Sequence, residues 1–190
     1  MKGRRTDQLL WITSLFFVVW LVWVETSFQY FEGSLGSELR LHSAGVALVA
    51  GSFLLPYGLV QIPIGRLIDR GRVELWLLLA ALAAACCSLV FASSDSLQGL
   101  LLSRIGTGMA CAVVFPASAV LARRSLPENR FALAMGFTDG LLGIGAALAA
   151  MVPLLLGRSG WRDLVLLQGL ALALIVALPM LLLGVRRSSS

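Results

Sequence analysis

Three ionisable side chains lie inside long apolar stretches of the sequence and are the first candidates for chemistry. They are Glu25, Arg104 and Asp139. In a membrane-spanning helix such a charge costs about 2.5–3.5 kcal/mol near the bilayer centre, so each should face protein or water. A carboxylate facing water can carry a proton, and a guanidinium can hold an anionic group. These residues therefore predict a polar pathway for a small solute, with a coupling proton as one option.

Glu25 and Arg104 are expected at a similar depth. At about 1.5 Å per residue, Glu25 lies roughly 9 Å and Arg104 roughly 8–10 Å from the same end of their helices. We predict that both face one polar cavity. There they either pair to fix helix register or leave Arg104 to an anionic solute or a proton. Asp139 lies roughly 12 Å from the other end, where we favour a packing role over a proton-carrying one.

A compact charged cluster, GRLIDRGR at 65–72, separates two apolar runs. Its arginines are explained by anchoring at a membrane surface. Asp69 and the glycines Gly65 and Gly71 need another reason, and glycine permits a tight turn and a close approach of helices. The cluster is therefore predicted to be a loop with a role beyond anchoring.

The elements that must position these residues are transmembrane helices. The chain has 190 residues, 58% hydrophobic and 13% charged, with a mean hydropathy of +0.90. A soluble domain carries about 25% charged residues. Six runs reach the roughly 20 apolar residues that a bilayer crossing needs. They predict an all-α membrane protein, one bundle over residues 1–190, with helices at 8–31, 44–64, 73–92, 99–122, 131–156 and 164–185.

Basic residues set the expected orientation. Of the 15 Lys and Arg residues, most fall on the side that carries both chain ends, whereas Arg40, Arg158 and Arg162 fall on the other. The positive-inside rule then places both termini in the cytoplasm, in an inner or plasma membrane. The net charge of +5 is a topology signal with some attraction to lipid headgroups, and it requires no nucleic acid. The first run is predicted to be a retained helix rather than a signal peptide.

Small residues mark the expected helix contacts. Gly136, Gly140 and Gly143 recur along the fifth run, and Gly108 lies in the fourth. Small residues let transmembrane helices approach closely, so these four positions are predicted to be packing sites. The cysteines show no metal-ligand spacing. No nucleophile–base set or nucleotide-binding loop appears, so we expect neither an enzyme nor a cofactor.

A weak internal sequence similarity relates the two halves of the chain. GRLIDRG at 65–71 and GRSGWRD at 157–163 both follow the second helix of a three-helix unit. Three helices reverse the direction of the chain, so these segments would lie on opposite membrane faces. That arrangement is what a 3+3 inverted repeat requires.

Taken together, these motifs resemble the N-terminal half of the major facilitator superfamily. Its hallmark loop between helices 2 and 3 is matched by Gly65, Leu67, Asp69, Arg70, Gly71 and Arg72, although this loop is one residue shorter. Arg104-x-x-x-Gly108-x-Ala110 resembles its helix-4 motif, whereas the fifth run lacks the Gly-Pro pair of the antiporter signature. The resemblance implies alternating-access transport of a small solute. It also implies a gating loop whose aspartate meets a helix N-terminus, where the dipole favours a carboxylate.

The resemblance also implies a missing partner, because a complete transporter of this kind has two six-helix halves with the site between them. The alternatives are a half-length or truncated permease, pairing with a separate second half, and a homodimer. A different class also stays open, namely a non-transporting membrane remnant or a regulatory or binding subunit. Arg104 tilts the expected substrate slightly toward anionic or zwitterionic solutes.

Overall fold

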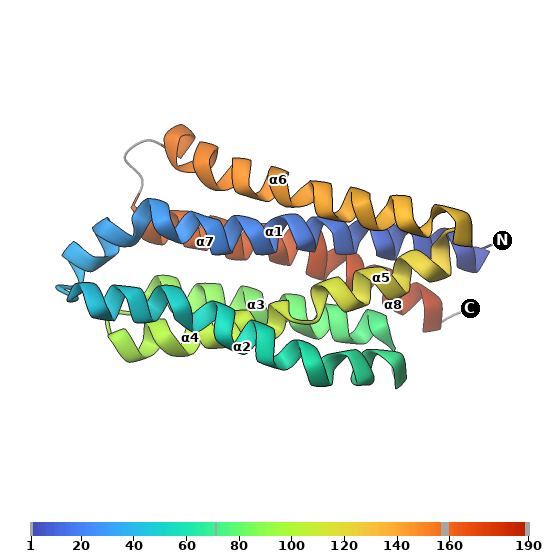
Figure 1. The fold of residues 1–190 in the computed structure, drawn as a ribbon, viewed down its shortest axis with the longest axis horizontal. Coiled ribbons are helices and arrows are strands. Elements are labelled where there is room, and N and C mark those ends of the chain that lie inside the picture. The colour runs from blue at the N-terminus through green and yellow to red at the C-terminus, as the bar shows by residue number, and fades with distance from the viewer. Residues whose placement is uncertain (1, 71, 157–159, 189–190) are drawn as a thin grey trace.

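The protein is a bundle of long, nearly parallel or antiparallel helices (Figure 1). A computed structural model describes residues 2–70, 72–156 and 160–188. The elements in chain order are α1 (Lys2–Glu38), α2 (Ser43–Arg70), α3 (Val73–Ser93), α4 (Leu97–Cys111), α5 (Val114–Ser125), the 3₁₀ turn η1 (Glu128–Arg130), α6 (Phe131–Leu156), α7 (Trp161–Leu172), the π-helical turn η2 (Ala173–Ala177) and α8 (Leu178–Ser188).

These elements form 6 helical segments that are long and apolar enough to cross a membrane. Three of them, α1, α2 and α3, are single helices, and the fifth span is α6 with the η1 turn before it. The fourth span joins α4 to α5, and the sixth joins α7, η2 and α8. The predicted all-α membrane fold with six spanning helices is confirmed.

The two ends of the bundle differ in composition. One end, called the terminal end below, carries both chain termini and the α5–η1–α6 turn (Figure 1). The α2–α3 connection lies at the same end. The other end, called the opposite end, carries the α1–α2 turn and the α3–α4 loop. Most basic residues of the sequence lie at the terminal end, in the groups that the sequence places beside these connections.

Three predicted helix limits were wrong. The first helix begins at Lys2 rather than at residue 8. The first helix continues to Glu38, seven residues past its predicted end at Phe31. The second continues to Arg70, so that Gly65 is helical and makes no turn. The second helix continues because apolar side chains are buried up to and past its predicted end at residue 64. Ile64 and Ile68, spaced i and i+4, are 6% and 1% exposed and pack this last turn against the bundle.

Proline accounts for the break in the fourth span. Pro116 lacks a backbone N–H, and its ring clashes with the carbonyl four residues earlier, at Ala112. The helix is interrupted between Cys111 and Val114. In the sixth span Pro179 follows the π-helical turn Ala173–Ala177. The carbonyl four residues before it, at Ile175, lies inside that turn, so the wider turn accommodates the proline.

The core lies around α1, which packs against α6, α5 and the sixth span. Within the most apolar window of each span, 44–61% of residues are buried for the first, third, fourth and sixth spans. The corresponding value is 17% for both α2 and α6. These two helices therefore sit on the bundle with most of their surface unpartnered in the described chain.

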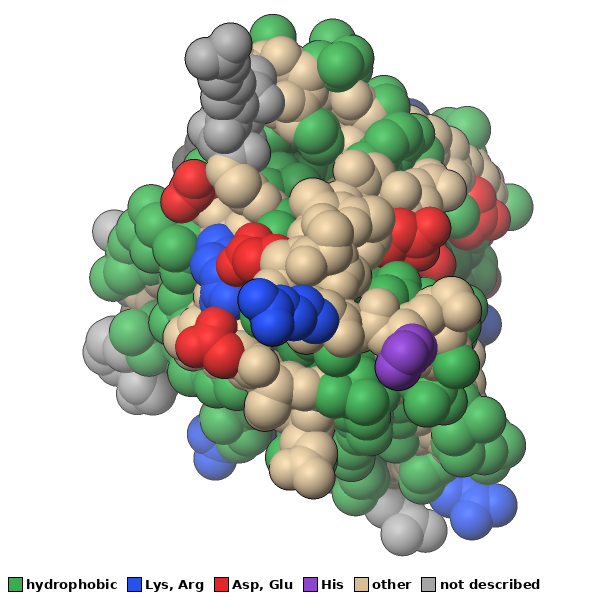
Figure 2. Space-filling view, turned by 90° about the vertical axis from the view of Figure 1, so that its left-hand side faces the viewer, with side chains coloured by type: hydrophobic (Ala, Val, Ile, Leu, Met, Phe, Trp, Pro, Cys, Tyr) green, Lys and Arg blue, Asp and Glu red, His purple; other side chains and the backbone are tan. Residues whose placement is uncertain are grey.

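A polar clamp holds the opposite end together. Arg162, in the first turn of α7, contacts Glu38 Oε1 at 3.0 Å and Asp95 Oδ1 at 2.6 Å, and donates to the Ala92 carbonyl at 2.6 Å. Trp161 Nε1 donates to Glu38 Oε2 at 2.7 Å. Figure 2 looks onto this end and shows basic and acidic side chains grouped side by side. The clamp fastens α1, α3 and α7 to one another.

Candidate functional site

A polar cavity opens between α1, α2 and α4. Its volume is about 550 Å³, and its lining includes Glu25, Gln29, Glu32, Phe28, Leu54 and Arg104. Glu25, Gln29 and Glu32 are spaced i, i+4 and i+7 along α1, so they lie on one face of the helix. The extension of α1 to Glu38 keeps that face helical, so the polar side chains point into one space rather than into a loop.

Arg104 is the most enclosed charge of this cavity, at 5% exposed. Its guanidinium carbon lies 4.9 Å from the centroid of the Phe28 ring and 5.0 Å from that of Phe53. Such contacts with aromatic rings favour a cation. Nη1 makes a long hydrogen bond of 3.5 Å to the Val24 carbonyl, and Nε has no partner within the described residues. The arginine is thus held by ring faces while its hydrogen-bonding capacity is largely unused.

Glu25 and Arg104 line the same cavity but do not form an ion pair. Within the described residues no carboxylate lies within the 4.0 Å ion-pair limit of this guanidinium. Glu25 is half-buried and accepts a hydrogen bond of 3.2 Å from Thr26 Oγ1. The predicted shared cavity is therefore present. The register-fixing pair, which was one of the two alternatives within it, is not formed.

The arrangement can bind an anionic group beside Arg104. The guanidinium offers five donors in a planar fork that matches a carboxylate or phosphate. Burial strengthens such an interaction because the surroundings screen it less than bulk water does. Glu25 and Glu32 add acceptors for a cationic or hydrogen-bonding part of the same molecule.

Asp139 does not belong to this cavity. It is an exposed residue of α6, about 12 Å from the start of that helix at 1.5 Å per residue. It is absent from the lining of the Arg104 cavity. The sequence-based expectation that it does not meet Arg104 agrees with this placement.

The charged cluster lies in the last turns of α2 and just beyond it, at the terminal end of the bundle. Asp69 and Arg72 are exposed, and Gly65 has open space around it. The side chain of Arg70 and the whole of Gly71 lie outside the described residues. The predicted loop is correspondingly short: within the described chain only Arg72 intervenes as a non-helical residue before α3.

Gly108 is a close-packing position of the kind predicted. A Cβ atom added to it would collide with the backbone carbonyl of Phe53 in α2. This approach of α4 to α2 also sets Phe53 beside Arg104. The glycine thereby helps to shape the wall of the cavity.

The packing prediction for α6 was wrong within this chain. Gly136, Gly140 and Gly143 have nothing within 4 Å of an added Cβ, whereas Gly145 lies against the Val19 carbonyl of α1. At about 100° per residue the three predicted glycines point 140–180° away from Gly145. They form an unpartnered face of α6 that also includes Asp139, three residues after Gly136.

Sequence reasoning missed a second polar group, behind Arg104. Gln168 is 1% exposed; its Nε2 donates to Ser27 Oγ at 2.7 Å, and its backbone carbonyl accepts from Trp20 Nε1 at 2.7 Å. With Arg104 and Thr107 it lines a cavity of about 20 Å³, which exceeds the roughly 10–15 Å³ that one water molecule needs. The available signal was a lone amide in the otherwise apolar sixth run.

The fold and the cavity define an integral membrane protein with a polar site at bilayer depth. The chain belongs to the Major Facilitator Superfamily, whose family model matches residues 7–190. This confirms the resemblance carried by the helix-4 motif and the charged cluster. Two similar proteins show how much of a longer chain this match covers.

The chain is 28% identical over 168 residues to an "MFS-type efflux pump" of Mycolicibacterium smegmatis, a match that covers 80% of this chain and 36% of that protein. Its fold is similar to the crystal structure of a bacterial homolog of the human lysosomal transporter Spinster, in an inward-facing and unoccupied conformation. The TM-score is 0.82 at 18% identity, covering 94% of this chain and 43% of that one. The chain therefore spans less than half the length of these two relatives.

Proposed function

We propose that the chain is one six-helix half of a transporter that moves a small solute across the membrane by alternating access. The observation that carries the proposal is Arg104, a buried cation at 5% exposure, beside a cavity of about 550 Å³ and without an ion-pair partner among the described residues. Buried charges in membrane proteins mark substrate and ion pathways by default. Membership of a family with transporter-like relatives supports the same conclusion.

The solute proposed is a small anion or zwitterion. Its anionic group would lie at the fork of Arg104, whose guanidinium is held by the Phe28 and Phe53 rings. Glu25 lies in the same cavity and would compete for Arg104 or accept a cationic group of the solute. Protonation of Glu25 would remove that competition, which gives a coupling proton a place to act.

A second six-helix half would cover the unpartnered faces of α2 and α6. Only 17% of the apolar window of each helix is buried, and the glycines Gly58 and Gly140 have open space. Asp139 lies on the α6 face, where contact with lipid tails would cost about 2.5–3.5 kcal/mol. A protein partner removes that cost. The partner is a second half on the same polypeptide, a separate chain or a second copy.

The charged cluster is proposed as a gate element at the cytoplasmic side of a plasma or inner membrane. Both termini would lie on that side, because the terminal end collects most basic residues. Asp69 is exposed and would meet a helix N-terminus of the second half, with Arg70 and Arg72 at the membrane surface. Gly65 and Gly71 would allow the close approach.

The proposal is tested on the purified protein with whatever partner co-purifies. A thermal-shift screen over amino acids, carboxylates and phosphorylated sugars selects solutes, which are then followed by uptake into proteoliposomes. Arg104→Gln should abolish both binding and uptake, whereas Arg40→Gln, at an exposed arginine of the opposite end, should leave them unchanged. A strict monomer that takes up none of these solutes would instead indicate a non-transporting membrane subunit.

A further inference from the structure

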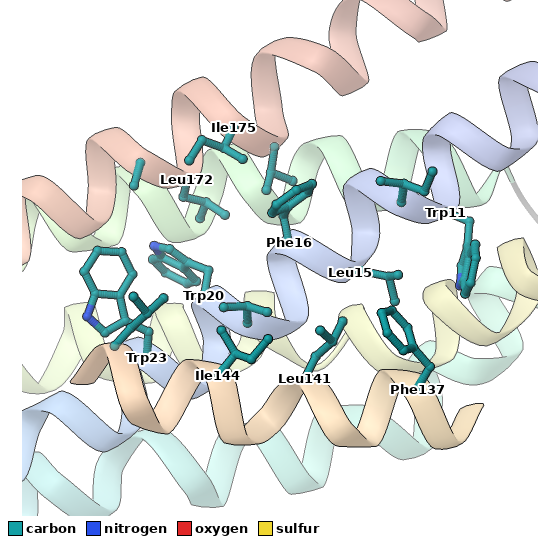
Figure 3. A pocket seen from close by; sticks show the side chains of 15 residues that line it. Trp11, Leu15, Phe16, Trp20, Trp23, Phe137, Leu141, Ile144, Leu172 and Ile175 are labelled. Carbon is teal, nitrogen blue, oxygen red and sulfur yellow. The ribbon is translucent and has the colours of Figure 1, made fainter. Parts of the chain in front are cut away.

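A long apolar groove runs along the terminal-end half of α1 and shares no lining residue with the Arg104 cavity. Its volume is about 590 Å³. The groove has α1 as its floor, α6 as one wall and the α7–η2 segment as the other (Figure 3). Both walls pack on α1, and α6 makes few contacts with the sixth span, so the space between the walls stays open.

The groove is suited to a hydrocarbon chain. Its floor carries Trp20 and Trp23, 3% and 8% exposed, and its walls present Ile144 and Leu172 (Figure 3). All of these residues lie within membrane-spanning segments. An elongated space with an apolar lining does not favour the binding of a polar solute. The elongated apolar molecule available at this depth is a lipid acyl chain.

The π-helical turn contributes to this lining. Ile175 and Val176 belong to Ala173–Ala177 and form part of the wall. Single π-helical turns inside α-helices occur frequently at functional sites. The turn lies beside the groove and away from the Arg104 cavity.

The terminal end, toward which the groove runs, carries basic residues that suit an anionic lipid headgroup. Of the basic residues that the three groove-forming spans carry at the terminal end, Arg130 has a described side chain, which is exposed in η1 directly before α6. The sequence also places Lys2, Arg4 and Arg5 at the start of α1 and Arg186 and Arg187 in α8, and their side chains lie outside the described residues. The acidic residues of the same segments are Asp7 and Glu128. Basic pockets between transmembrane helices bind anionic headgroups.

We propose that the groove holds an acyl chain of an anionic phospholipid whose headgroup lies at the basic terminal end of the bundle, beside Arg130. The lipid then acts as a wedge between α6 and the sixth span, and it belongs to the leaflet at the terminal end. The site differs from the solute cavity in its position, its lining and the class of its ligand.

Brominated lipids test this directly, because bromine on an acyl chain quenches a tryptophan that it contacts. Three of the 5 tryptophans, Trp11, Trp20 and Trp23, line the groove. A Trp76→Phe background leaves Trp161 as an unquenched reference, since it is buried at 4% exposure beneath Phe31 and Phe91 at the opposite end. In vesicles mixing phosphatidylglycerol and phosphatidylcholine, half-maximal quenching should need an about five-fold lower mole fraction of brominated phosphatidylglycerol than of brominated phosphatidylcholine.

Two matched pairs of variants locate the lipid. Ala171→Phe fills the groove and should reduce quenching by both brominated lipids, whereas Ala83→Phe, on the exposed surface of α3, should not. Arg130→Gln should move the phosphatidylglycerol curve toward the phosphatidylcholine curve, whereas Arg72→Gln should leave it in place. Coincident curves for the two lipids, or equal quenching in Ala171→Phe and Ala83→Phe, would overturn the proposal. Because Arg130 is exposed in a turn, its variant decides the headgroup question even if Ala171→Phe does not fold.

Discussion

Gly108 of α4 lies directly against the backbone carbonyl of Phe53 in α2, with no room for a Cβ atom between them. The same approach places the Phe53 ring 5.0 Å from the Arg104 guanidinium. The contact between two backbones therefore fixes the position of one aromatic wall of the cavity.

Gly108→Ala should destabilise the protein, because backbone atoms cannot move aside as a flexible side chain can. Overpacking of this kind costs about 1–3 kcal/mol. The matched control is Gly33→Ala, which has open space around it and should be neutral or stabilising by up to about 1 kcal/mol. Thermal unfolding in detergent measures both, and equal melting temperatures would contradict the close contact.

The hydrogen bond between Gln168 Nε2 and Ser27 Oγ, at 2.7 Å, should show a measurable but small coupling. Side-chain hydrogen bonds between transmembrane helices average about 0.6 kcal/mol, with a maximum of about 1.7. A double-mutant cycle with Gln168→Leu and Ser27→Ala measures this term from unfolding free energies. Additive effects of the two substitutions would mean that the bond contributes nothing.

Arg162→Gln should loosen the clamp at the opposite end. The donor to the Ala92 carbonyl matters most, because a hydrogen bond from a charged group contributes about 1.5–3 kcal/mol. The partner Asp95 has a side chain 83% exposed, so Asp95→Asn should cost less than about 1 kcal/mol. Equal losses of unfolding free energy in the two variants would assign the stability to the ion pair instead.

Arg104→Lys should bind solute at least about ten-fold more weakly than the wild type. Lysine keeps the charge but loses the planar fork and the ring contacts with Phe28 and Phe53. Thermal shift with the solute from the screen reports binding, and uptake reports transport. Wild-type affinity in this variant would show that a positive charge is sufficient for solute binding, without the planar guanidinium.

Gly140→Trp should prevent the second half from docking on α6 while leaving the six-helix bundle folded. Gly140 is exposed, and an added Cβ meets nothing within 4 Å in the described chain, so we expect the indole to point away from the bundle and toward a partner. Co-purification, or particle mass in a mild detergent, measures the assembly. Ala83→Trp on the exposed surface of α3 is the control. Unchanged assembly in Gly140→Trp would place the partner elsewhere.

The sequence predicted the number of spans because bilayer thickness imposes a length that hydropathy reveals. It also placed Glu25 and Arg104 at one depth, since helical rise converts residue number into distance. The depth of a residue does not determine how its helix is rotated about its axis, and so it does not determine which way the side chain points. The two residues therefore share a cavity without pairing, and the rings of Phe28 and Phe53 around Arg104 could not be foreseen.

The glycines of α6 show the same limit. Gly136, Gly140, Gly143 and Gly145 look alike in sequence, yet only Gly145 packs against α1. A stripe of small residues identifies a face but does not say which neighbour covers it. The breaks at Ala112 and within Ala173–Ala177 follow from Pro116 and Pro179, whereas Pro56 and Pro63 lie within a continuous α2.

The bond between Trp20 and Gln168 joins residues separated by 148 positions in sequence. At a synthesis rate of about 5–20 residues per second, Trp20 leaves the ribosome roughly 7–30 s before Gln168 does. For that interval the indole N–H of the first span must find another acceptor, in lipid, in the insertion machinery or in water. The α1 helix thus acquires this partner only when the sixth span has entered the membrane.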